Sequence, residues 1–555
     1  MTMMAARKAI VEVLRGEDVE YVFGIPGATE VLFVDALEGV PDIRYILGLH
    51  EIVCAAMAEG YAKASGKVGF LNLHNAPGTA AALPILYNAQ TGNVPLVVTA
   101  GQNDTRLLQY DPHLTGDIVG MGRIYTKWST EIVHGEDIPT VLQRAFKIAA
   151  QPPTGPVLVS IPQNVLAHQF DFEYKPNTVL YPRLRPDKAA LELALKIVRE
   201  AKKPVLLVES GVTRGDALEQ VIRFAELAGV RVYQPWMADV NFPVSHAQYL
   251  GDLDPSSPST KEVFQDVDVV IAIGCSLFAH GFFNPVRILP RDAKIIQIDD
   301  NPWEIGKNMP ADCGIQADIK ACLVELNERL EKGMSGPARQ DVQRRIERIA
   351  EEKRRSDDQL RTQLGKERDR IPMAVSRLMT EIRDAMPPDA VIVDECWSSS
   401  EMLRKVIERT EPRTFFRARK GGSLGSGLPG ALGVKLGLPH KPVIAVSGDG
   451  SAAWSMQSFW TAAHYRIPVT FVIVNNASYR QVKLVRKRVL GTYPLDEKHL
   501  GMEIDDPIID FIRLAGSMGV MGEAVRHPDD LHQALTAAID SGEPRVVEVF
   551  VQNEP

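Results

Sequence analysis

The sequence predicts an α/β protein made of three consecutive doubly wound parallel sheets. Short runs rich in valine and isoleucine alternate with longer stretches of helical period along all 555 residues, which is the pattern of β-α-β units. A chain of this length is too long for one hydrophobic core and is expected to divide into several domains. The alternation occurs three times in units of similar size, so we expect three domains.

The clearest strand candidates are short apolar runs that end near turn-forming residues. Four fall in each third of the chain. They are residues 19–24, 69–74, 95–101 and 155–162, then 203–211, 230–235, 267–274 and 293–302, and finally 389–395, 441–450, 469–476 and 545–551.

Two polar segments separate these groups of strands. Residues 174–188 carry the prolines and polar side chains of a linker. Residues 341–370 form a run of charges, which is typical of a solvated helix that crosses between domains. We therefore predict a first domain at 1–180, a central domain at 186–335, a charged helical linker at 336–371 and a last domain at 372–555.

The composition excludes several classes of function. The net charge of −8 provides no basic surface for nucleic acid. The five cysteines show neither CxxC nor zinc-like spacing, as expected for reduced thiols in the cytoplasm. The first residues become charged too early for a signal peptide, and nothing in the sequence requires a membrane. We expect a cytoplasmic protein.

Two unusual sequences end successive strand candidates in the last domain. One strand ends in Gly448-Asp449-Gly450, and the next ends in an asparagine pair that includes Asn476. Carboxyl ends of successive parallel strands meet at the edge of the sheet where α/β proteins bind ligands. Either sequence alone fits a turn or a helix cap. Together they predict neighbouring polar groups at one site.

These groups supply oxygen atoms, which hard cations prefer. Asp449 offers a carboxylate, Asn476 an amide oxygen and Ser478 a backbone carbonyl, so the sequence predicts Mg²⁺ or Ca²⁺ rather than zinc. Such a site fills its remaining positions with water and phosphate oxygens. The small residues after Asp449, beginning with Gly450 and Ser451, allow a diphosphate to approach the start of a helix.

Asp449 and Asn476 are 27 residues apart, and here the sequence resembles the diphosphate-binding motif of thiamine diphosphate enzymes. The first third resembles the pyrimidine-binding domain of the 2-oxo acid decarboxylase and acetolactate synthase group, most of all the benzoylformate decarboxylases. The segments that carry the likeness of the first third are 23–30, 49–67, 70–83 and 94–102. The matches to the benzoylformate decarboxylases are Asn72-Leu73-His74, Thr99 to Gln102 and, in the last domain, Ser458 to Pro468.

The resemblance implies roles for several residues. Glu51 would hydrogen-bond N1′ of the cofactor's pyrimidine ring, although a surface ion pair with Lys63 or Arg44 is the alternative. His74 and His280 would transfer protons, and His113 lies in a loop that carries active-site residues in related decarboxylases. Further cofactor contacts fall on the backbone carbonyl of Gly422, on Leu424 as the wedge that bends the cofactor, and on Ser398 and Tyr479.

Three positions depart from the benzoylformate decarboxylase pattern. Ala28 replaces a serine that helps to bind the substrate carboxylate, Trp397 stands where a small polar residue is usual, and Arg480 stands where glycine is common. We place these three residues in the substrate pocket. These residues suit a 2-oxo acid that is different from or larger than benzoylformate, or an acyl acceptor in place of a proton.

The resemblance implies a lyase that decarboxylates a 2-oxo acid, benzoylformate-like, without oxidation and releases an aldehyde and CO₂. The alternatives are a carboligase or lyase of the acetolactate synthase or 2-hydroxyacyl-CoA lyase type, and a non-catalytic cofactor-binding subunit. The implied assembly is a homodimer as the minimal active unit, doubled to a homotetramer. No flavin motif is visible between Pro186 and Leu330, so we predict no FAD.

Overall fold

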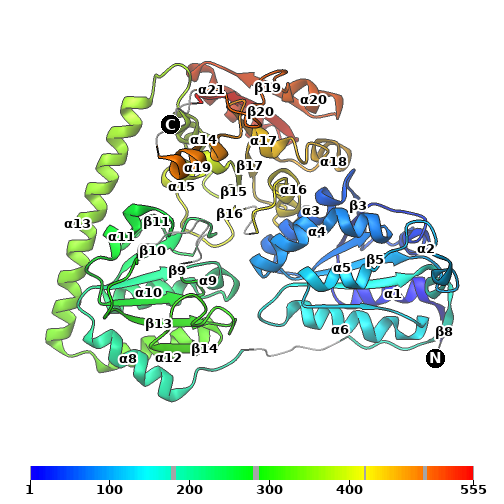
Figure 1. The fold of residues 1–555 in the computed structure, drawn as a ribbon, viewed down its shortest axis with the longest axis horizontal. Helices are drawn as coiled ribbons and strands as arrows, with labels where there is room; N and C mark the ends of the chain where they lie inside the picture. The colour runs from blue at the N-terminus through cyan, green and yellow to red at the C-terminus, as the bar shows by residue number, and fades with distance from the viewer. Residues whose placement is uncertain are drawn as a thin grey trace. The chain divides into compact units, whose positions relative to one another are not determined.

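The computed structural model describes residues 2–176, 183–239, 241–278, 287–417, 421–491 and 497–553. The chain forms two compact units. The first unit contains residues 1–180, 370–400 and 418–555, and the second contains residues 181–369 and 401–417. Each unit is built from helices packed on parallel sheets (Figure 1). The prediction of an α/β fold with three sheets is confirmed.

The first sheet lies in the first unit and has the strand order β3-β2-β4-β5-β7-β6, with all neighbours parallel. Its strands are β2 (Tyr21–Gly24), β3 (Arg44–Leu47), β4 (Gly69–Leu73), β5 (Leu96–Gln102), β6 (Trp128–Glu131) and β7 (Pro156–Pro162). Its helices are α1 (Ala6–Gly16), α2 (Val31–Leu37), α3 (Glu51–Ser65), α4 (Asn75–Gly92), α5 (Ile118–Tyr125), α6 (Ile138–Ala150) and α7 (Gln163–Ala167). A separate antiparallel pair joins β1 (Thr2–Ala5) to β8 (Gln169–Phe172).

The second sheet lies in the second unit and has the order β11-β10-β9-β12-β13-β14, again with parallel neighbours. Its strands are β9 (Pro204–Val208), β10 (Arg231–Pro235), β11 (Tyr249–Leu253), β12 (Val269–Ile273), β13 (Lys294–Asp299) and β14 (Cys313–Gln316). Its helices are α8 (Lys188–Glu200), α9 (Gly211–Arg214), α10 (Leu218–Ala228), α11 (Pro258–Phe264), α12 (Ile319–Gly333) and α13 (Gly336–Glu367).

The third sheet has the order β15-β17-β18-β20-β19 within the first unit, with parallel neighbours. These strands are β15 (Val391–Glu395), β17 (Val443–Gly448), β18 (Thr470–Asn475), β19 (Met521–Val525) and β20 (Arg545–Phe550). Its helices are α14 (Val375–Ala385), α16 (Gly427–Gly437), α17 (Asp449–Ala452), α18 (Ser458–Tyr465), α19 (Arg480–Leu490), α20 (Phe511–Ser517) and α21 (Pro528–Asp540), with the 3₁₀ turn η3 (Trp397–Ser399). Helix α15 (Ser400–Val406) and strand β16 (Phe415–Arg417) follow η3 in the chain. Except for Ser400, their residues belong to the second unit.

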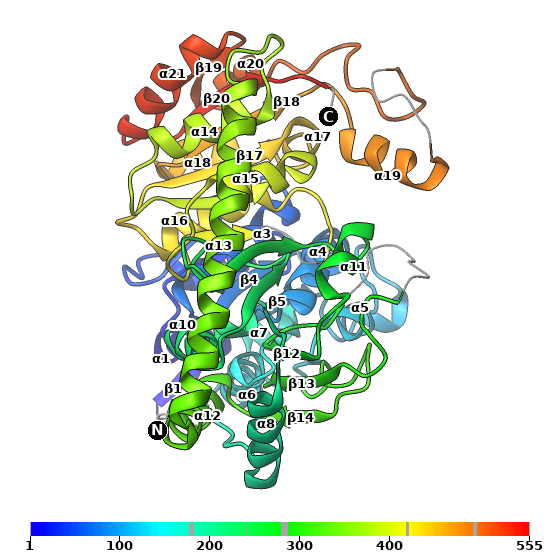
Figure 2. The same ribbon diagram turned by 90° about the vertical axis from the view of Figure 1, so that its left-hand side faces the viewer.

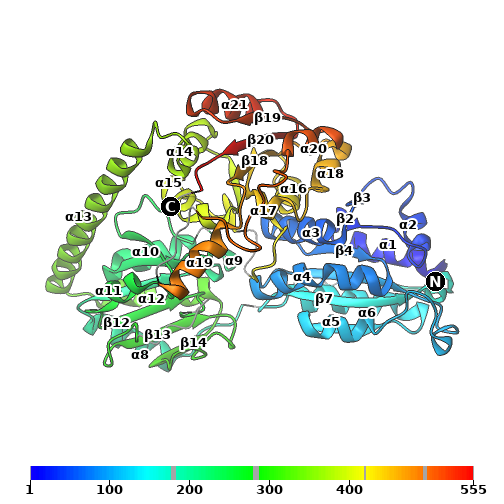
Figure 3. The ribbon, with the colours of Figure 1, turned by 45° about the horizontal axis from the view of Figure 1, so that its top comes forward.

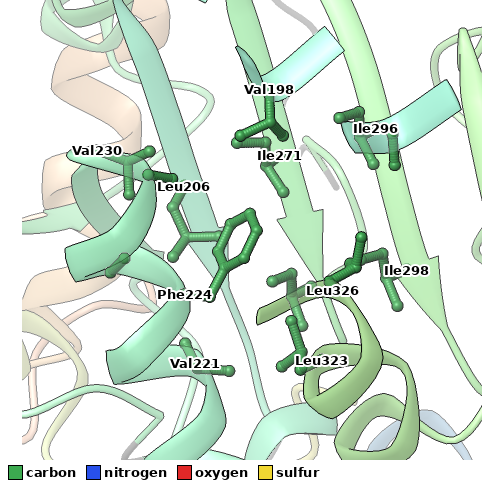
Figure 4. Close-up of a cluster of buried hydrophobic side chains, with 14 of the residues drawn as sticks. Val198, Leu206, Val221, Phe224, Val230, Ile271, Ile296, Ile298, Leu323 and Leu326 are labelled. Atoms are coloured by element: carbon green, nitrogen blue, oxygen red, sulfur yellow. The ribbon is translucent and has the colours of Figure 1, made fainter. Parts of the chain in front are cut away.

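The second sheet is buried on both faces. Alternate strand residues point to opposite sides. Leu206 and Ile271 join Phe224 and the other buried side chains of α8, α10 and α12 on one face (Figure 4). Val205 and Val270 belong to a separate cluster on the other face. Because side chains on both faces of the sheet are buried, the sequences of these strands are continuous apolar runs.

The charged run forms a single long helix, α13, which Figure 2 shows as continuous. Ser335 caps its first turn, and among its described residues Ile349 alone is fully buried. The guanidinium group of Arg345 donates to the carbonyl of Ala228, at 2.7 Å, where α10 ends. This bond satisfies a carbonyl that the end of α10 leaves free, and it attaches α13 to the central domain.

Helices α3 and α16 join the first and third sheets inside the first unit, and they lie side by side in Figures 1 and 3. Glycines permit the close approach. A Cβ atom at Gly60 would lie 2.2 Å from the carbonyl oxygen of Gly430, and one at Gly433 would lie 2.0 Å from that of Met57. Because a side chain would collide with backbone at both contacts, the small residues fix the spacing of the two helices.

No helix in the described ranges combines the length and the apolar character needed to cross a membrane. The cytoplasmic location stays a prediction.

Candidate functional site

Glu51 begins α3, at the carboxyl edge of the first sheet. The preceding residue, His50, caps the helix by accepting the N–H of Ile52 at 3.1 Å. The Glu51 carboxylate lies against α4, because a Cβ atom at Gly78 would be 3.4 Å from its Oε1. Its side chain is 20% exposed, so the burial expected from the sequence is only partial.

The surface ion pairs considered for Glu51 do not form among the described residues. Lys63 instead pairs with Glu59 at 3.0 Å. The guanidinium group of Arg44 lies over the ring of Tyr21. Within the described part of the chain, the Glu51 carboxylate forms no ion pair with a lysine or arginine, and the ring nitrogen of His50 that accepts the N–H of Ile52 lies 4.0 Å away.

His74 follows β4 and hydrogen-bonds with a buried carboxylate. Its Nδ1 lies 2.8 Å from Oε2 of Glu30, and Glu30 is 2% exposed. Thr29 donates its hydroxyl to the other Glu30 oxygen at 2.5 Å, and the backbone N–H of Gly27 donates to Oε2 at 3.1 Å. These bonds fix the carboxylate, which in turn orients the imidazole ring.

Glu30 was not predicted as a site residue, although it lies in the segment that carries the family resemblance. The available signal was an acidic residue directly after Gly27-Ala28-Thr29 and before an apolar helix. Gly27 is needed here, because a Cβ atom would lie 2.0 Å from Nδ1 of His74. Ala28 is exposed in the same loop.

The third sheet brings the predicted cation ligands to one edge. Strands β17 and β18 are parallel neighbours, with Gly448 opposite Val474, and Asp449 follows at once. Asp449 is buried. Burial raises the pKa of Asp449 to about 7, although the backbone N–H groups of Gly450, Ala477 and Ser478 oppose the shift.

The two asparagines that follow β18 have different environments. Asn475 donates to Oε1 of Glu548 at 2.7 Å, and its side-chain oxygen accepts the N–H of Ala477 at 3.0 Å. Its amide is therefore part of the sheet's internal hydrogen bonding. The Asn476 oxygen accepts from the N–H of Ser478 at 3.0 Å and from its hydroxyl at 3.2 Å, so the Asn476 side chain is held by its own turn and not by the sheet.

These residues fit a hard cation. A carboxyl whose pKa burial raises to about 7 is stabilised in its ionised form by an adjacent positive charge. The predicted ligands, which are Asp449, Asn476 and the backbone of Ser478, offer carboxylate, amide and carbonyl oxygens, and such oxygens suit Mg²⁺ or Ca²⁺.

A neighbouring segment holds the turn after β18 in place. The N–H of Tyr479 donates to the carbonyl of Met502, and the N–H of Ile504 donates to the carbonyl of Ala477, each at 2.8 Å. The ring of Tyr479 then packs over Gly450, where a Cβ atom would lie 2.7 Å from the ring. Glycine after Asp449 is thus required by this packing. Ser451, the next residue, is buried in α17.

The loop before α16 carries Gly422 and Leu424. Gly422 has a φ of +88° and faces open space, and Leu424 is half-buried. The loop is fixed by Glu395, whose carboxylate accepts three backbone N–H groups at 2.7–3.1 Å, from residues 425, 426 and 427. Asn88 of α4 also accepts the N–H of Ser423 at 3.1 Å. Glu395 and Asn88 were not predicted from the sequence.

Three domains of one family match the chain in order. The N-terminal TPP binding domain of thiamine pyrophosphate enzymes matches residues 4–121, the central domain matches 191–326, and the C-terminal TPP binding domain matches 398–549. A probable acetolactate synthase large subunit from Methanocaldococcus jannaschii is 30% identical over 99% of this chain and 92% of its own length. The chain belongs to the thiamine pyrophosphate enzyme family.

Members of this family with two different reactions resemble the chain over its full length. The benzoylformate decarboxylase of Pseudomonas aeruginosa is 30% identical and is covered over 99% of both chains. Among solved structures, the thiamine diphosphate-dependent 4-hydroxybenzoylformate decarboxylase of Rhodococcus jostii RHA1 has a TM-score of 0.85, 26% sequence identity and 99% coverage of both chains. The family, whose cofactor is thiamine diphosphate, is therefore clear, and its substrate range is broad.

Two of the three residues that we predicted for the substrate pocket, Trp397 and Arg480, lie on elements that contact each other. Trp397 and Ser398 are half-buried in η3, which contacts α19, where Arg480 is the first residue. Arg480 is buried, and its burial lowers the pKa of the guanidinium group. Ala28 belongs to the first-sheet loop beside His74 and not to this group.

His113, the other predicted histidine within the described residues, is not brought to the site by any described contact. His113 is exposed, and its backbone carbonyl accepts from the side chain of Asn103 at 2.9 Å. His280 lies outside the described residues.

Proposed function

We propose that this chain is a thiamine diphosphate-dependent lyase that decarboxylates a 2-oxo acid, without oxidation, to an aldehyde and CO₂. One observation favours this reaction, namely the 2.8 Å hydrogen bond between Nδ1 of His74 and the buried carboxylate of Glu30. After CO₂ leaves, the acyl carbon must gain a proton to become an aldehyde. An imidazole held by a carboxylate is suited to deliver it.

The residues of the chain would divide the remaining work. When bound, thiamine diphosphate supplies a carbon nucleophile and an electron sink for the broken C–C bond. Glu51 would hold a proton at N1′ of the pyrimidine ring. Asp449, Asn476 and the backbone carbonyl of Ser478 would hold Mg²⁺ against the diphosphate. Leu424 would support the bent form of the cofactor.

The other proposed cofactor contacts are the carbonyl of Gly422, the turn that contains Gly448, Gly450 and Ser451, and the side chains of Ser398 and Tyr479. The open space at Gly422 and Gly448 supports this proposal, because a Cβ atom at either position would meet nothing within 4 Å. We assign no FAD to the central domain, which stays a prediction.

A carboligase of the acetolactate synthase type is the second candidate. Acetolactate synthases from Haemophilus influenzae and other organisms are 30% identical to this chain over nearly its full length. In that reaction the acyl carbon joins a second carbonyl compound instead of gaining a proton. A non-catalytic cofactor-binding subunit is the third candidate, and the presence of both Glu51 and His74 argues against it.

We further propose a homodimer as the minimal active unit, doubled to a homotetramer in the cytoplasm. In this arrangement the first domain of one subunit and the last domain of its partner would hold opposite ends of one cofactor. The proposal follows from the family resemblance.

A panel of 2-oxo acids tests the reaction. The protein would be incubated with thiamine diphosphate, Mg²⁺ and each acid, and CO₂, aldehyde and acyloin would be quantified. We expect CO₂ and aldehyde in equal amounts. Acyloin as the main product would favour the carboligase. A Glu51→Gln variant with the parent level of activity would contradict the role given to Glu51.

A further inference from the structure

Arg480 is a buried cation without a described counter-charge. It is 7% exposed, and its Nε has no hydrogen-bond partner among the described residues. Burying a guanidinium group is costly unless an acceptor compensates for the lost water. The Nε of Arg480 therefore lacks an acceptor that an anion could supply.

The position of Arg480 in its helix also favours an anion. It is the first residue of α19, whose first turn has no acidic residue. The start of a helix carries a partial positive charge, which disfavours a cation there and favours an anion. Lys483, one turn later, is also buried, but Glu503 lies 2.9 Å from its amino group. Among the described residues, Lys483 is thus paired with a carboxylate, whereas Arg480 is not.

Ser399 provides a second, independent observation. It lies in η3, which contacts α19, and it is 2% exposed. Its Oγ also has no hydrogen-bond partner among the described residues. Two elements in contact thus each bury a hydrogen-bond donor that lacks an acceptor.

No described side-chain hydrogen bond joins Arg480 or Ser399 to the predicted metal ligands. The Asp449 carboxylate is stabilised by the backbone N–H groups of Gly450, Ala477 and Ser478. No described hydrogen bond or ion pair joins Arg480 to Asp449, so the guanidinium group remains available for another anion.

We propose that Arg480 and Ser399 form a subsite for a second anionic group on the substrate. The inference rests on the proposed function and narrows its substrate class to 2-oxo acids that carry a carboxylate or phosphonate on the side chain. A guanidinium group binds either anion through paired hydrogen bonds. Trp397, two residues before Ser399, replaces the small polar residue usual in the family and would add an apolar wall.

Binding can be measured without turnover. The protein would be loaded with Mg²⁺ and oxythiamine diphosphate, which lacks the 4′-amino group needed for reaction. Calorimetric titrations would compare 2-oxoglutarate with 2-oxopentanoate, 2-oxoadipate with 2-oxohexanoate, and 3-phosphonopyruvate with 2-oxobutyrate. We expect at least one dianion to bind about tenfold or more tightly than its monoanionic counterpart, as one charged hydrogen bond provides.

Arg480→Met removes the charge but keeps the length of the side chain, and it should abolish this preference. Ser399→Ala should reduce it, and Arg480→Lys should retain part of it. Lys487→Met is the matched control, because Lys487 is an exposed cation on the same helix. It should bind every acid as the parent does. Thermal unfolding would verify that each variant is folded.

Three results would overturn the inference. The first is that the parent binds dianions and monoanions with equal affinity. The second is that Arg480→Met keeps the parent's preference for dianions. The third is that Arg480→Met keeps this preference but binds oxythiamine diphosphate more weakly. The last would assign Arg480 to the cofactor. If the parent bound dianions more tightly than monoanions but decarboxylated none of the acids when loaded with thiamine diphosphate, the proposed function would be contradicted and the subsite would be supported. If the parent and Arg480→Met decarboxylated only monoanionic 2-oxo acids, and did so equally well, the proposed function would be supported and the subsite would be rejected.

Discussion

At the scale of single residues, the carboxylate of Glu30 decides how His74 can act. Its two oxygens bind the ring of His74, the hydroxyl of Thr29 and the N–H of Gly27, so the imidazole has one preferred orientation. The sequence predicted His74 from its place after a strand. It did not predict Glu30, because the contact joins residues 44 positions apart.

Glu30→Gln should lower kcat by about tenfold to one hundredfold, since proton transfer by a misoriented imidazole is less efficient. The affinity for thiamine diphosphate should stay unchanged, because Glu30 is not among the groups proposed to hold it. Steady-state kinetics and cofactor titration would measure both quantities. Glu38→Gln, an exposed change directly after α2, is the control. A Glu30→Gln enzyme with the parent kcat would refute the positioning role.

At the scale of elements, the packing of α3 on α16 links Glu51 to the third sheet. Gly433→Ala should lower the free energy of unfolding by about 1–3 kcal/mol, because its Cβ would press on the Met57 carbonyl 2.0 Å away. Gly516→Ala in α20 is the matched control, since a Cβ there meets nothing within 4 Å. That change should be neutral or slightly stabilising. Urea unfolding of both variants would be compared, and equal effects would contradict the packing argument.

The strands show how far the sequence predicts the fold. Every strand candidate named from the sequence corresponds to a strand of one of the three sheets, such as β4, β12 or β17. Strands β3, β6, β11, β14 and β19, which lie at sheet edges, were not identified. The pattern of β19, MGEAV, is exposed at four of its five positions. Edge strands lack the double burial that makes a continuous apolar run, so composition alone does not reveal them.

The same limit applies to the candidate site. Asp449 and Asn476 could be predicted because each follows directly after an apolar strand. Glu395 also follows a strand, but its function depends on the backbone N–H groups of residues 425–427. That contact spans at least 30 positions of sequence. Residues that act by orienting a distant loop become visible only in the fold.

At the scale of the whole molecule, residues 401–417 leave the third domain and join the second unit through charged contacts. Asp252 lies 2.6 Å from Nε of Arg404 and 3.5 Å from a guanidinium nitrogen of Arg409. Burial alone would raise the pKa of Asp252, but the two guanidinium groups outweigh it and hold that pKa well below its usual range. The folded pKa is thus below the unfolded one.

Stability from Asp252 should therefore be fully present at neutral pH and decline as the pH falls below about 4, the usual range of aspartate. Asp252→Asn should cost about 3–5 kcal/mol at neutral pH, because it leaves two buried cations without their carboxylate. The variant should also lose less stability on acidification than the parent. Urea unfolding at several pH values, with the exposed change Asp529→Asn as control, measures this. Parallel acid profiles for parent and variant would contradict it.

If two subunits share each cofactor, dilution should reduce specific activity in step with dissociation of the dimer. Activity and sedimentation velocity would be measured over the same range of concentrations, with saturating thiamine diphosphate and Mg²⁺. Full activity in a sample shown to be monomeric would exclude the shared site.

The central claim is that the edge of the third sheet holds a divalent cation and the diphosphate of thiamine diphosphate. The most direct test is calorimetric titration of cofactor-free protein with thiamine diphosphate, with and without Mg²⁺. We expect tight binding that requires Mg²⁺ in the parent and in the exposed control Asp529→Asn, and a loss of at least about tenfold in Asp449→Asn. Binding by Asp449→Asn with parental affinity and parental dependence on Mg²⁺ would contradict the account.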